Sequence, residues 1–172
     1  MTDWTIRLAQ PGDADHWPAI ERAAGTLFSG DPDLADLDFD ETWEPDELRA
    51  LIRKGHCLSA SLGQRPIGFL ASQPFSRELH VWEMSVHPDG QRLGIGSALM
   101  RACLVDAHNS GFKAVTLTTF RDLAWNGPFY AALGFEEVTA LDAHPRLSAE
   151  LALEADNGLP PERRCAMIRF LD

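Results

Sequence analysis

One stretch near the middle of the chain limits what it can fold into more than any other. An extended, apolar-rich run at residues 79–86 is followed by a turn and a glycine-containing loop, Gln91-Arg92-Leu93-Gly94-Ile95-Gly96-Ser97. A helical pattern over residues 95–109 then closes at Gly111. A strand therefore leads through a loop into a helix, whose first N–H groups lack partners and whose dipole favours negative charge. The stretch predicts an anion-binding site.

The order of residues in this loop separates it from two familiar phosphate-binding patterns. A Walker A loop needs Lys directly after its last glycine, but Ser97 follows Gly96. A dinucleotide-binding loop needs a third glycine at the position of Leu99. The loop instead resembles the pyrophosphate loop Arg/Gln-x-x-Gly-x-Gly/Ala of the GNAT superfamily, the acyl-coenzyme A-dependent N-acyltransferases. By itself the pattern also fits a helix that simply begins after a tight turn.

A second resemblance to the same superfamily lies downstream. The segment Asn126-Gly127-Pro128-Phe129-Tyr130-Ala131-Ala132-Leu133-Gly134-Phe135 is similar to the GNAT pattern N-x-x-F/Y-Y-x-x-x-G-F. The resemblance implies that Asn126 contacts the cofactor arm and that the Tyr130 hydroxyl lies near the thioester sulfur. It also implies that the Gly-Phe pair begins the strand that separates from its neighbour to admit the pantetheine. Two motifs in the family's order argue against a chance resemblance.

Hydrophobic periodicity predicts strands and helices in an order that fits this family. Strands are expected at residues 4–8, 56–62, 66–72, 78–86, 113–119, 134–138 and 164–171, and helices at residues 14–28, 45–53, 95–109 and 122–133. Residues 142–163, with three prolines and a glycine, are expected to form a long excursion.

This order predicts an α+β fold. It resembles the GNAT fold over residues 4–140, with the final strand added. The resemblance implies a mixed, mostly antiparallel sheet of six to seven strands, flanked by about four helices. It also implies that the sheet is splayed between the fourth and fifth strands.

Composition excludes several other classes of protein. The 172 residues are 45% hydrophobic and 24% charged, which fits one globular domain, residues 1–172. No apolar run approaches the about 20 residues of a membrane-spanning helix, and the N-terminus lacks a signal-peptide pattern. Three widely separated cysteines indicate a reduced, cytoplasmic protein without a zinc site. The net charge of −11 disfavours nucleic acid as a partner.

Residues 31–47 hold nine carboxylates and no Lys or Arg. One interpretation is that this segment flanks the acceptor site and attracts a cationic amine. The other, which we favour from the sequence, is a solvated loop with apolar anchors, because charge runs usually face water. The apolar residues interleaved with the carboxylates are Leu34, Leu37, Phe39 and Trp43.

The chemistry of acyl transfer assigns roles to two ionisable residues. An amine acceptor must lose a proton before it attacks a thioester, and the leaving thiolate needs one. By resemblance Tyr130, the only tyrosine in the chain, is the general acid. Glu83 is our candidate for the general base, with His80 and proton loss through water as alternatives. Strand alternation puts Glu83 on the face opposite His80, unless a bulge intervenes.

The resemblance also implies which residues contact acetyl-coenzyme A. The backbone of Met84 and Val86 pairs with the pantetheine amides like an added strand. The remaining contacts come from the loop, the first turn of its helix and the second motif, at Gln91, Arg92, Leu93, Gly94, Ile95, Gly96, Ser97, Asn126, Phe129 and Tyr130. Gly90 stands where many members carry a large residue, which predicts a looser start to the loop and leaves the first phosphate contact open.

The predicted activity is N-acetyl transfer from acetyl-coenzyme A to a primary amine, with no metal. The acceptor is a small molecule or a peptide amine, and the acidic segment mildly favours a cationic one. Two alternatives keep the same fold: a catalytically silent coenzyme A-binding module, and a dimeric interaction domain. The second would use Trp43, Trp82 and Trp125 as interface anchors.

Overall fold

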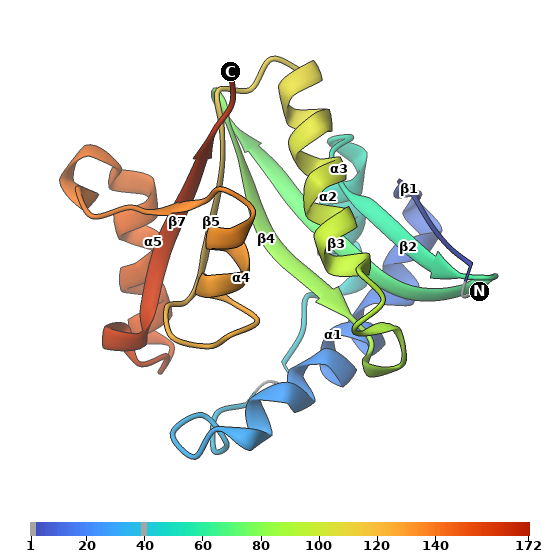
Figure 1. Ribbon diagram of the computed structural model, residues 1–172, viewed down its shortest axis with the longest axis horizontal. Helices are drawn as coiled ribbons and strands as arrows, with labels where there is room; N and C mark the ends of the chain where they lie inside the picture. The colour runs from blue at the N-terminus through green and yellow to red at the C-terminus, as the bar shows by residue number, and fades with distance from the viewer. Residues whose placement is uncertain (1–2, 39–40) are drawn as a thin grey trace.

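Seven strands form one mixed sheet in the computed structural model, which describes residues 3–38 and 41–172 (Figure 1). The strands lie in the order β1-β2-β3-β4-β5-β7-β6. Their bounds are β1 (Trp4–Leu8), β2 (Leu58–Leu62), β3 (Arg65–Phe75), β4 (Glu78–Val86), β5 (Ala114–Phe120), β6 (Glu136–Glu137) and β7 (Arg164–Phe170). Neighbouring strands run antiparallel except β4 and β5, which run parallel. The predicted mixed, mostly antiparallel sheet is confirmed.

Five α-helices within these residues cover the two faces of the sheet (Figure 1). They are α1 (Trp17–Gly25), α2 (Pro45–Arg53), α3 (Ile95–Asn109), α4 (Gly127–Ala132) and α5 (Pro145–Asp156). On one face, α3 and α4 pack over a core that includes Leu99 and Met100. On the other face, α1 and α2 cover Phe69 and Ala71 of β3. There α5 packs through Leu147 beside β5 and β7.

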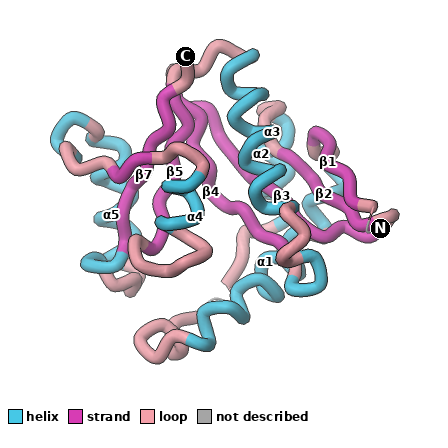
Figure 2. The backbone as a smooth tube through the Cα atoms, viewed as in Figure 1, coloured by secondary structure: helices cyan, strands magenta, loops and turns pink. Residues whose placement is uncertain are grey.

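The parallel strands β4 and β5 stay paired for only part of their length. Their register runs from Glu78↔Ala114 to Val81↔Leu117 and ends there. Figure 2 shows the two strands together at the end near the C-terminus and apart at the other end. The predicted splay between the fourth and fifth strands is therefore confirmed. Among the described residues, no strand pairs with this edge of β4 after Val81.

A β-bulge at Trp82 changes which side chains of β4 face which layer. The register of β4 against β3 shifts between Val81 and Glu83, so Trp82 is the extra residue. Val81 and Met84 both contact the core under α3, which strict alternation would forbid. Glu83 therefore lies on the same face of the sheet as His80. Strand alternation alone would put these two side chains on opposite faces, and the bulge removes that expectation.

The expected long excursion at residues 142–163 is wrong in its main part, because it contains α5. Pro145 occupies the first turn of this helix. The N–H groups of the first turn have no acceptor within the helix, so a proline there costs no helical hydrogen bond. Its fixed φ angle also suits the helix. The proline therefore begins a helix where the sequence pattern was interpreted as a break.

Other boundaries also differ from the prediction. The expected helix at residues 14–28 is α1 between two 3-10 turns, Pro11–Asp15 and Thr26–Gly30, and the helix expected at residues 122–133 shortens to α4. Gly134 and Phe135 lead into β6, which pairs with β7 at the sheet edge, so they do not begin the strand that separates. Within residues 3–38 and 41–172, no helix combines the length and apolar character that crossing a membrane requires.

The turn after β4 packs closely on β3. Gly90 is buried, and a Cβ at this position would lie 2.5 Å from Cγ1 of Ile67. The looser loop predicted at Gly90 is therefore wrong. The missing side chain allows the turn to sit directly against Ile67 and fixes where the following loop begins.

Gly90→Ala is expected to lower the free energy of unfolding by about 1–3 kcal/mol, the usual cost of overpacking a well-filled region. Denaturant unfolding followed by circular dichroism measures this. Gly12→Ala is the matched control, because a Cβ at Gly12 would meet nothing within 4 Å. Equal stability of the two variants would contradict the packing argument.

Candidate active site

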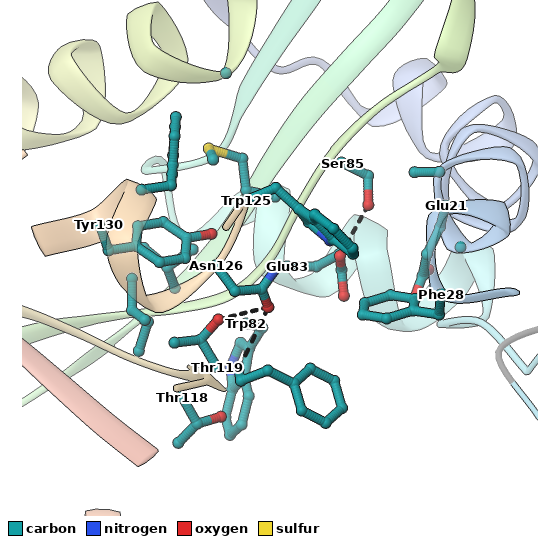
Figure 3. A pocket seen from close by; sticks show the side chains of 18 of the residues that line it. Glu21, Phe28, Trp82, Glu83, Ser85, Thr118, Thr119, Trp125, Asn126 and Tyr130 are labelled. Atoms are coloured by element: carbon teal, nitrogen blue, oxygen red, sulfur yellow. Dashed lines mark hydrogen bonds between the residues drawn. The ribbon is translucent and has the colours of Figure 1, made fainter. Parts of the chain in front are cut away.

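A cavity of about 520 Å³ opens where β4 and β5 separate. Its walls come from both strands, from α1 and the segment after it, from the start of α3 and from the approach to α4. Glu83, Gly96, Asn126 and Tyr130 all line it, and Figure 3 shows Glu83 and Tyr130 turned toward the same space. The fold thus brings both sequence motifs to a single cavity.

The loop between β4 and α3 has the backbone shape of an anion cradle. Arg92 and Gly94 have φ values of 64° and 81°, and left-handed residues next to a helix start allow successive N–H groups to converge on one anion. Gly94 caps α3 without a side-chain hydrogen bond, so the first helical N–H groups have no capping oxygen. A Cβ at Gly96 would approach Phe129 no closer than 3.7 Å. Packing alone therefore does not require a glycine at position 96. The absence of a side chain leaves space in which a ligand can approach the backbone.

Side chains of the loop divide between the core and the surface. Ile95 is 1% exposed, and both Ile95 and Leu93 contact the core under α3. Only their backbone is therefore available to a ligand. The Gln91 side chain donates from Nε2 to the Val86 carbonyl at 3.0 Å, which ties the loop to the end of β4. The Arg92 side chain is exposed.

The free edge of β4 presents backbone N–H groups to the cavity. His87 N–H donates to the Ile67 carbonyl on β3. Because successive backbone groups alternate in direction along a strand, the N–H groups of Met84 and Val86 point to the opposite edge. That edge faces the space that β5 has left, and both residues line the cavity.

Asn126 is held through its carbonyl oxygen. Thr119 Oγ1 lies 2.7 Å from Asn126 Oδ1, and the Phe120 N–H donates to the same oxygen at 3.4 Å. A backbone N–H can only donate, so the accepting atom is the amide oxygen rather than the nitrogen. The amide NH2 of Asn126 is left to donate toward the cavity that it lines.

Tyr130 is oriented by two aromatic neighbours. Its ring centroid lies 5.2 Å from that of Phe129 and 5.8 Å from that of Phe135. Burial, and next the negative charge of Glu83, raise the pKa of the Tyr130 hydroxyl above its ordinary value of 10. The phenol therefore keeps its proton at neutral pH, as a general acid must.

Glu83 is fixed by its neighbour on β4. Ser85 Oγ donates to Glu83 Oε1 at 2.8 Å. Burial raises the pKa of Glu83 above its ordinary value, and the Ser85 hydrogen bond and the charge of Arg164 oppose that rise. A raised pKa makes a carboxylate a better base toward an amine.

Glu21, which the sequence did not single out, is a second carboxyl in the same cavity (Figure 3). Its Oε2 accepts a long hydrogen bond of 3.4 Å from the Trp43 N–H. Burial, and next the charge of Glu83, raise the pKa of Glu21 to about 8. One glutamate in an amphipathic helix carries no sequence signal, and only the packing of α1 beside β4 reveals it.

His80, the alternative base, is engaged elsewhere. It is 1% exposed, and its Nδ1 lies 2.8 Å from Thr116 Oγ1 and 3.0 Å from Arg146 Nη1. Burial, and next the charge of Arg146, lower the pKa of His80 to about 3. The imidazole is neutral, and its Nδ1 lone pair is already occupied.

The three tryptophans considered as interface anchors do not form one exposed surface. The rings of Trp43 and Trp82 pack on each other with centroids 5.7 Å apart. Trp125 is 39% exposed and lies 6.2 Å from Phe28, ring to ring. Trp82 and Trp125 both line the cavity, so two of the three belong to the site.

The acidic segment, residues 31–47, is not simply a solvated loop. Asp38 and Glu41 line the cavity, and Leu34 is fully buried. Asp31 accepts hydrogen bonds from both terminal nitrogens of Arg163, at 3.0 and 2.7 Å. Phe39 and Asp40 lie outside the described residues. The segment therefore forms a wall of the cavity as well as surface.

Solved structures share this fold. The PaiA N-acetyltransferase of Thermoplasma acidophilum, in complex with coenzyme A, is 14% identical, with a TM-score of 0.73 over 98% of this chain and 99% of that one. The ribosomal-protein-S18-alanine N-acetyltransferase of Escherichia coli is 18% identical, with a TM-score of 0.69 over 99% and 95%. Diaminobutyrate acetyltransferase from Paenibacillus lautus, bound to L-2,4-diaminobutyric acid and coenzyme A, is 16% identical, with a TM-score of 0.60 over 80% and 81%.

A family model gives the stronger result. The model of the Acetyltransferase (GNAT) family matches residues 20–135, more than half of the chain. The match runs from within α1 through the glycine loop to the second motif, so it includes most of the residues that line the cavity. This chain belongs to the Acetyltransferase (GNAT) family.

Proposed function

We propose that this chain transfers the acetyl group of acetyl-coenzyme A to the primary amine of an acceptor molecule. One observation carries the proposal. A single cavity joins a backbone anion cradle, an unpaired strand edge, and a carboxylate and a phenol with raised pKa values. Those are the parts that hold a diphosphate, hold an amide-containing arm and move two protons.

The residues around the cavity fit acetyl-coenzyme A. The N–H groups from Arg92 to Ser97 would hold the pyrophosphate at the start of α3. Met84 and Val86 would donate their backbone N–H groups to the pantetheine arm, as a neighbouring strand does. The Asn126 amide NH2 and the Phe129 ring would bound the far side of that arm. Acetyl-coenzyme A supplies an acetyl group activated as a thioester.

Two side chains would handle the protons of the reaction. Glu83 accepts a proton from the acceptor ammonium, directly or through water, which frees the nitrogen lone pair for attack on the carbonyl carbon. A backbone N–H on the free edge of β4 stabilises the developing negative charge on the carbonyl oxygen. Tyr130 donates its proton to the sulfur as the carbon–sulfur bond breaks.

The ionisable groups also favour an enzyme over a silent binding module. Coenzyme A binding requires the cradle and the strand edge but gains nothing from a buried carboxylate. Holding Glu83 and Glu21 together in a desolvated cavity works against folding. Such an arrangement is typical of sites where protons are moved.

Gly96→Val tests the cradle. The new side chain would fill the space above the first turn of α3, so we expect the dissociation constant for coenzyme A to rise about tenfold or more. Isothermal titration calorimetry measures this. His108→Val is the control, because it adds the same β-branched side chain at an exposed position in the last turn of α3. Equal affinity in both variants would exclude the cradle as the diphosphate site.

Tyr130→Phe tests the general acid. It removes one hydroxyl and keeps the ring contacts with Phe129 and Phe135. We expect kcat to fall about 10²- to 10⁴-fold, with coenzyme A affinity changed by about twofold at most. Release of free thiol in the presence of a panel of amines measures turnover. Unchanged kcat would remove Tyr130 from this role.

A further inference from the structure

The cavity is lined by several carboxyl side chains. Four carboxyl side chains from three parts of the chain line it: Glu21 on α1, Asp38 and Glu41 in the segment after α1, and Glu83 on β4. A concave site with carboxylates on several walls attracts cations and repels anions. Its charge therefore bears on which amine the enzyme accepts.

One cationic side chain, Arg164 on β7, lines the cavity among the described residues. It contacts Glu154 on α5 directly. Arg164 Nη2 donates to Glu154 Oε1 at 2.8 Å, and Nε donates to the same oxygen at 3.1 Å. The charge of Arg164 is therefore shared between Glu154, which it contacts directly, and Glu83, whose raised pKa it only partly opposes.

The buried pair Glu21 and Glu83 is the part of the lining that a cationic ligand group would stabilise most. Each carboxyl raises the cost of ionising the other, as shown by the effect of Glu83 on the pKa of Glu21. Burial without a partner cation is unfavourable for the charged form. A positively charged ligand group would offset this repulsion. It would pair with the second carboxyl group as that group loses its proton.

Aromatic rings line the cavity together with the carboxyls. Phe28, Trp82 and Trp125 all line it, and the rings of Phe28 and Trp125 lie 6.2 Å apart. Aromatic faces attract ammonium groups and also pack against methylene chains. A flexible aliphatic chain that carries ammonium groups matches both properties.

An ion pair and an apolar cluster hold the segment after α1 in place beside the cavity. Arg163, just before β7, holds Asp31 through two hydrogen bonds of 2.7 and 3.0 Å. Next to this pair, Leu34 packs with Phe28 and Phe120 in one apolar cluster. These contacts connect the segment after α1 to the opposite side of the split sheet.

We propose that the acceptor is a small aliphatic amine that carries a second cationic group, of the diamine or polyamine class, and that Glu21 is the specificity-determining residue that binds this second group. The inference rests on the proposed acetyl transfer. Glu83 takes one proton of the reacting ammonium, and the amine nitrogen then bonds to the acetyl carbon. As the carbon–sulfur bond breaks, Tyr130 protonates the departing sulfur, and the second proton of the nitrogen passes to the Tyr130 phenolate. Glu21, with Asp38 and Glu41 nearby in the lining, binds the distal ammonium, which does not react.

Matched amines test the acceptor class. Thiol release is measured with 1,4-diaminobutane and spermidine, with butylamine as the equally long monoamine, and with a short peptide that has a free N-terminus. We expect kcat/KM for the diamine to exceed that for butylamine about tenfold or more. The difference should shrink at high salt, because the extra attraction is electrostatic. Preference for butylamine or for the peptide would overturn the proposal.

Glu21→Gln tests the residue. It should lower kcat/KM for 1,4-diaminobutane about tenfold or more and change that for butylamine by about threefold at most. Asp36→Asn is the control, because it removes one charge from an exposed position in the same acidic segment, outside the cavity lining. An equal loss with both amines would mean that Glu21 has a general structural or catalytic role, and would contradict the assignment.

A binding measurement without acetyl-coenzyme A separates this inference from the proposed function. Thermal unfolding is followed with and without 1,4-diaminobutane. The wild-type Tm should rise more with the diamine than with butylamine, and Glu21→Gln should abolish the difference. If the diamine stabilises the protein but no amine releases thiol, the acetyl transfer is wrong and the cation site stands. If thiol is released but the two amines behave alike, the cation site is wrong.

The pH dependence of stability gives an independent check. The pKa of Glu21 is about 8 in the folded protein, raised by burial and by Glu83 and opposed by Arg22 and the Trp43 N–H. An unfolded chain would release this proton near the ordinary value of 4.5. Stability is therefore lost as pH rises from about 4.5 through about 8. Between pH 5 and 8.5, Tm of Glu21→Gln should fall less than that of the wild type; parallel curves would contradict a buried, proton-holding Glu21.

Discussion

The separation of β4 from β5 is the constraint on which the rest of the site depends. Pairing stops at Val81↔Leu117, so in the part of the chain that the structure describes no strand lies beside the backbone N–H groups on this edge of the last part of β4. Unpaired backbone groups in the interior are costly and need another partner. A cavity along that edge lets water or the amides of a bound ligand take this role. The missing strand contact is therefore what turns the middle of a sheet into a binding site.

The bulge at Trp82 determines what chemistry this cavity can carry. Without the extra residue, Glu83 would face the core under α3, where a carboxylate would be surrounded by side chains such as Leu99 and Met100. With the bulge, the aliphatic residues after it remain in that core, and Glu83 turns toward α1. There it meets the cavity and Glu21. One inserted residue thus keeps the core apolar and delivers the carboxylate to the opposite face.

The parts of the site that depend on local chain geometry could be predicted from the sequence. The glycine loop follows from residues close together in the chain, because turn and capping chemistry is local. The second motif and the splayed sheet were expected from the resemblance to the GNAT superfamily. What could not be predicted depends on contacts between distant segments. Glu21 becomes notable only because α1 packs beside β4, and Gly90 only because Ile67 lies against it.

Helix α5 was missed because Pro145 can either break a helix or begin one, and the packing of Leu147 on the sheet decides between them.

Helix α5 also fixes the point at which the sheet begins to split. Arg146 lies across the last paired residues of the two strands. Its Nη1 lies 3.0 Å from His80 on β4, and its Nη2 donates to Thr116 on β5 at 2.9 Å and to Glu78 at 2.8 Å. Burial, and next the charge of Arg146, keep His80 neutral, so the Nδ1 lone pair of the imidazole can accept a hydrogen bond and the two strands are joined on this face. Just beyond this junction no comparable contact links β4 to β5, within the residues that the structure describes, and the strands diverge. A histidine that looked like a candidate base is therefore better explained as part of the joint that sets the mouth of the cavity.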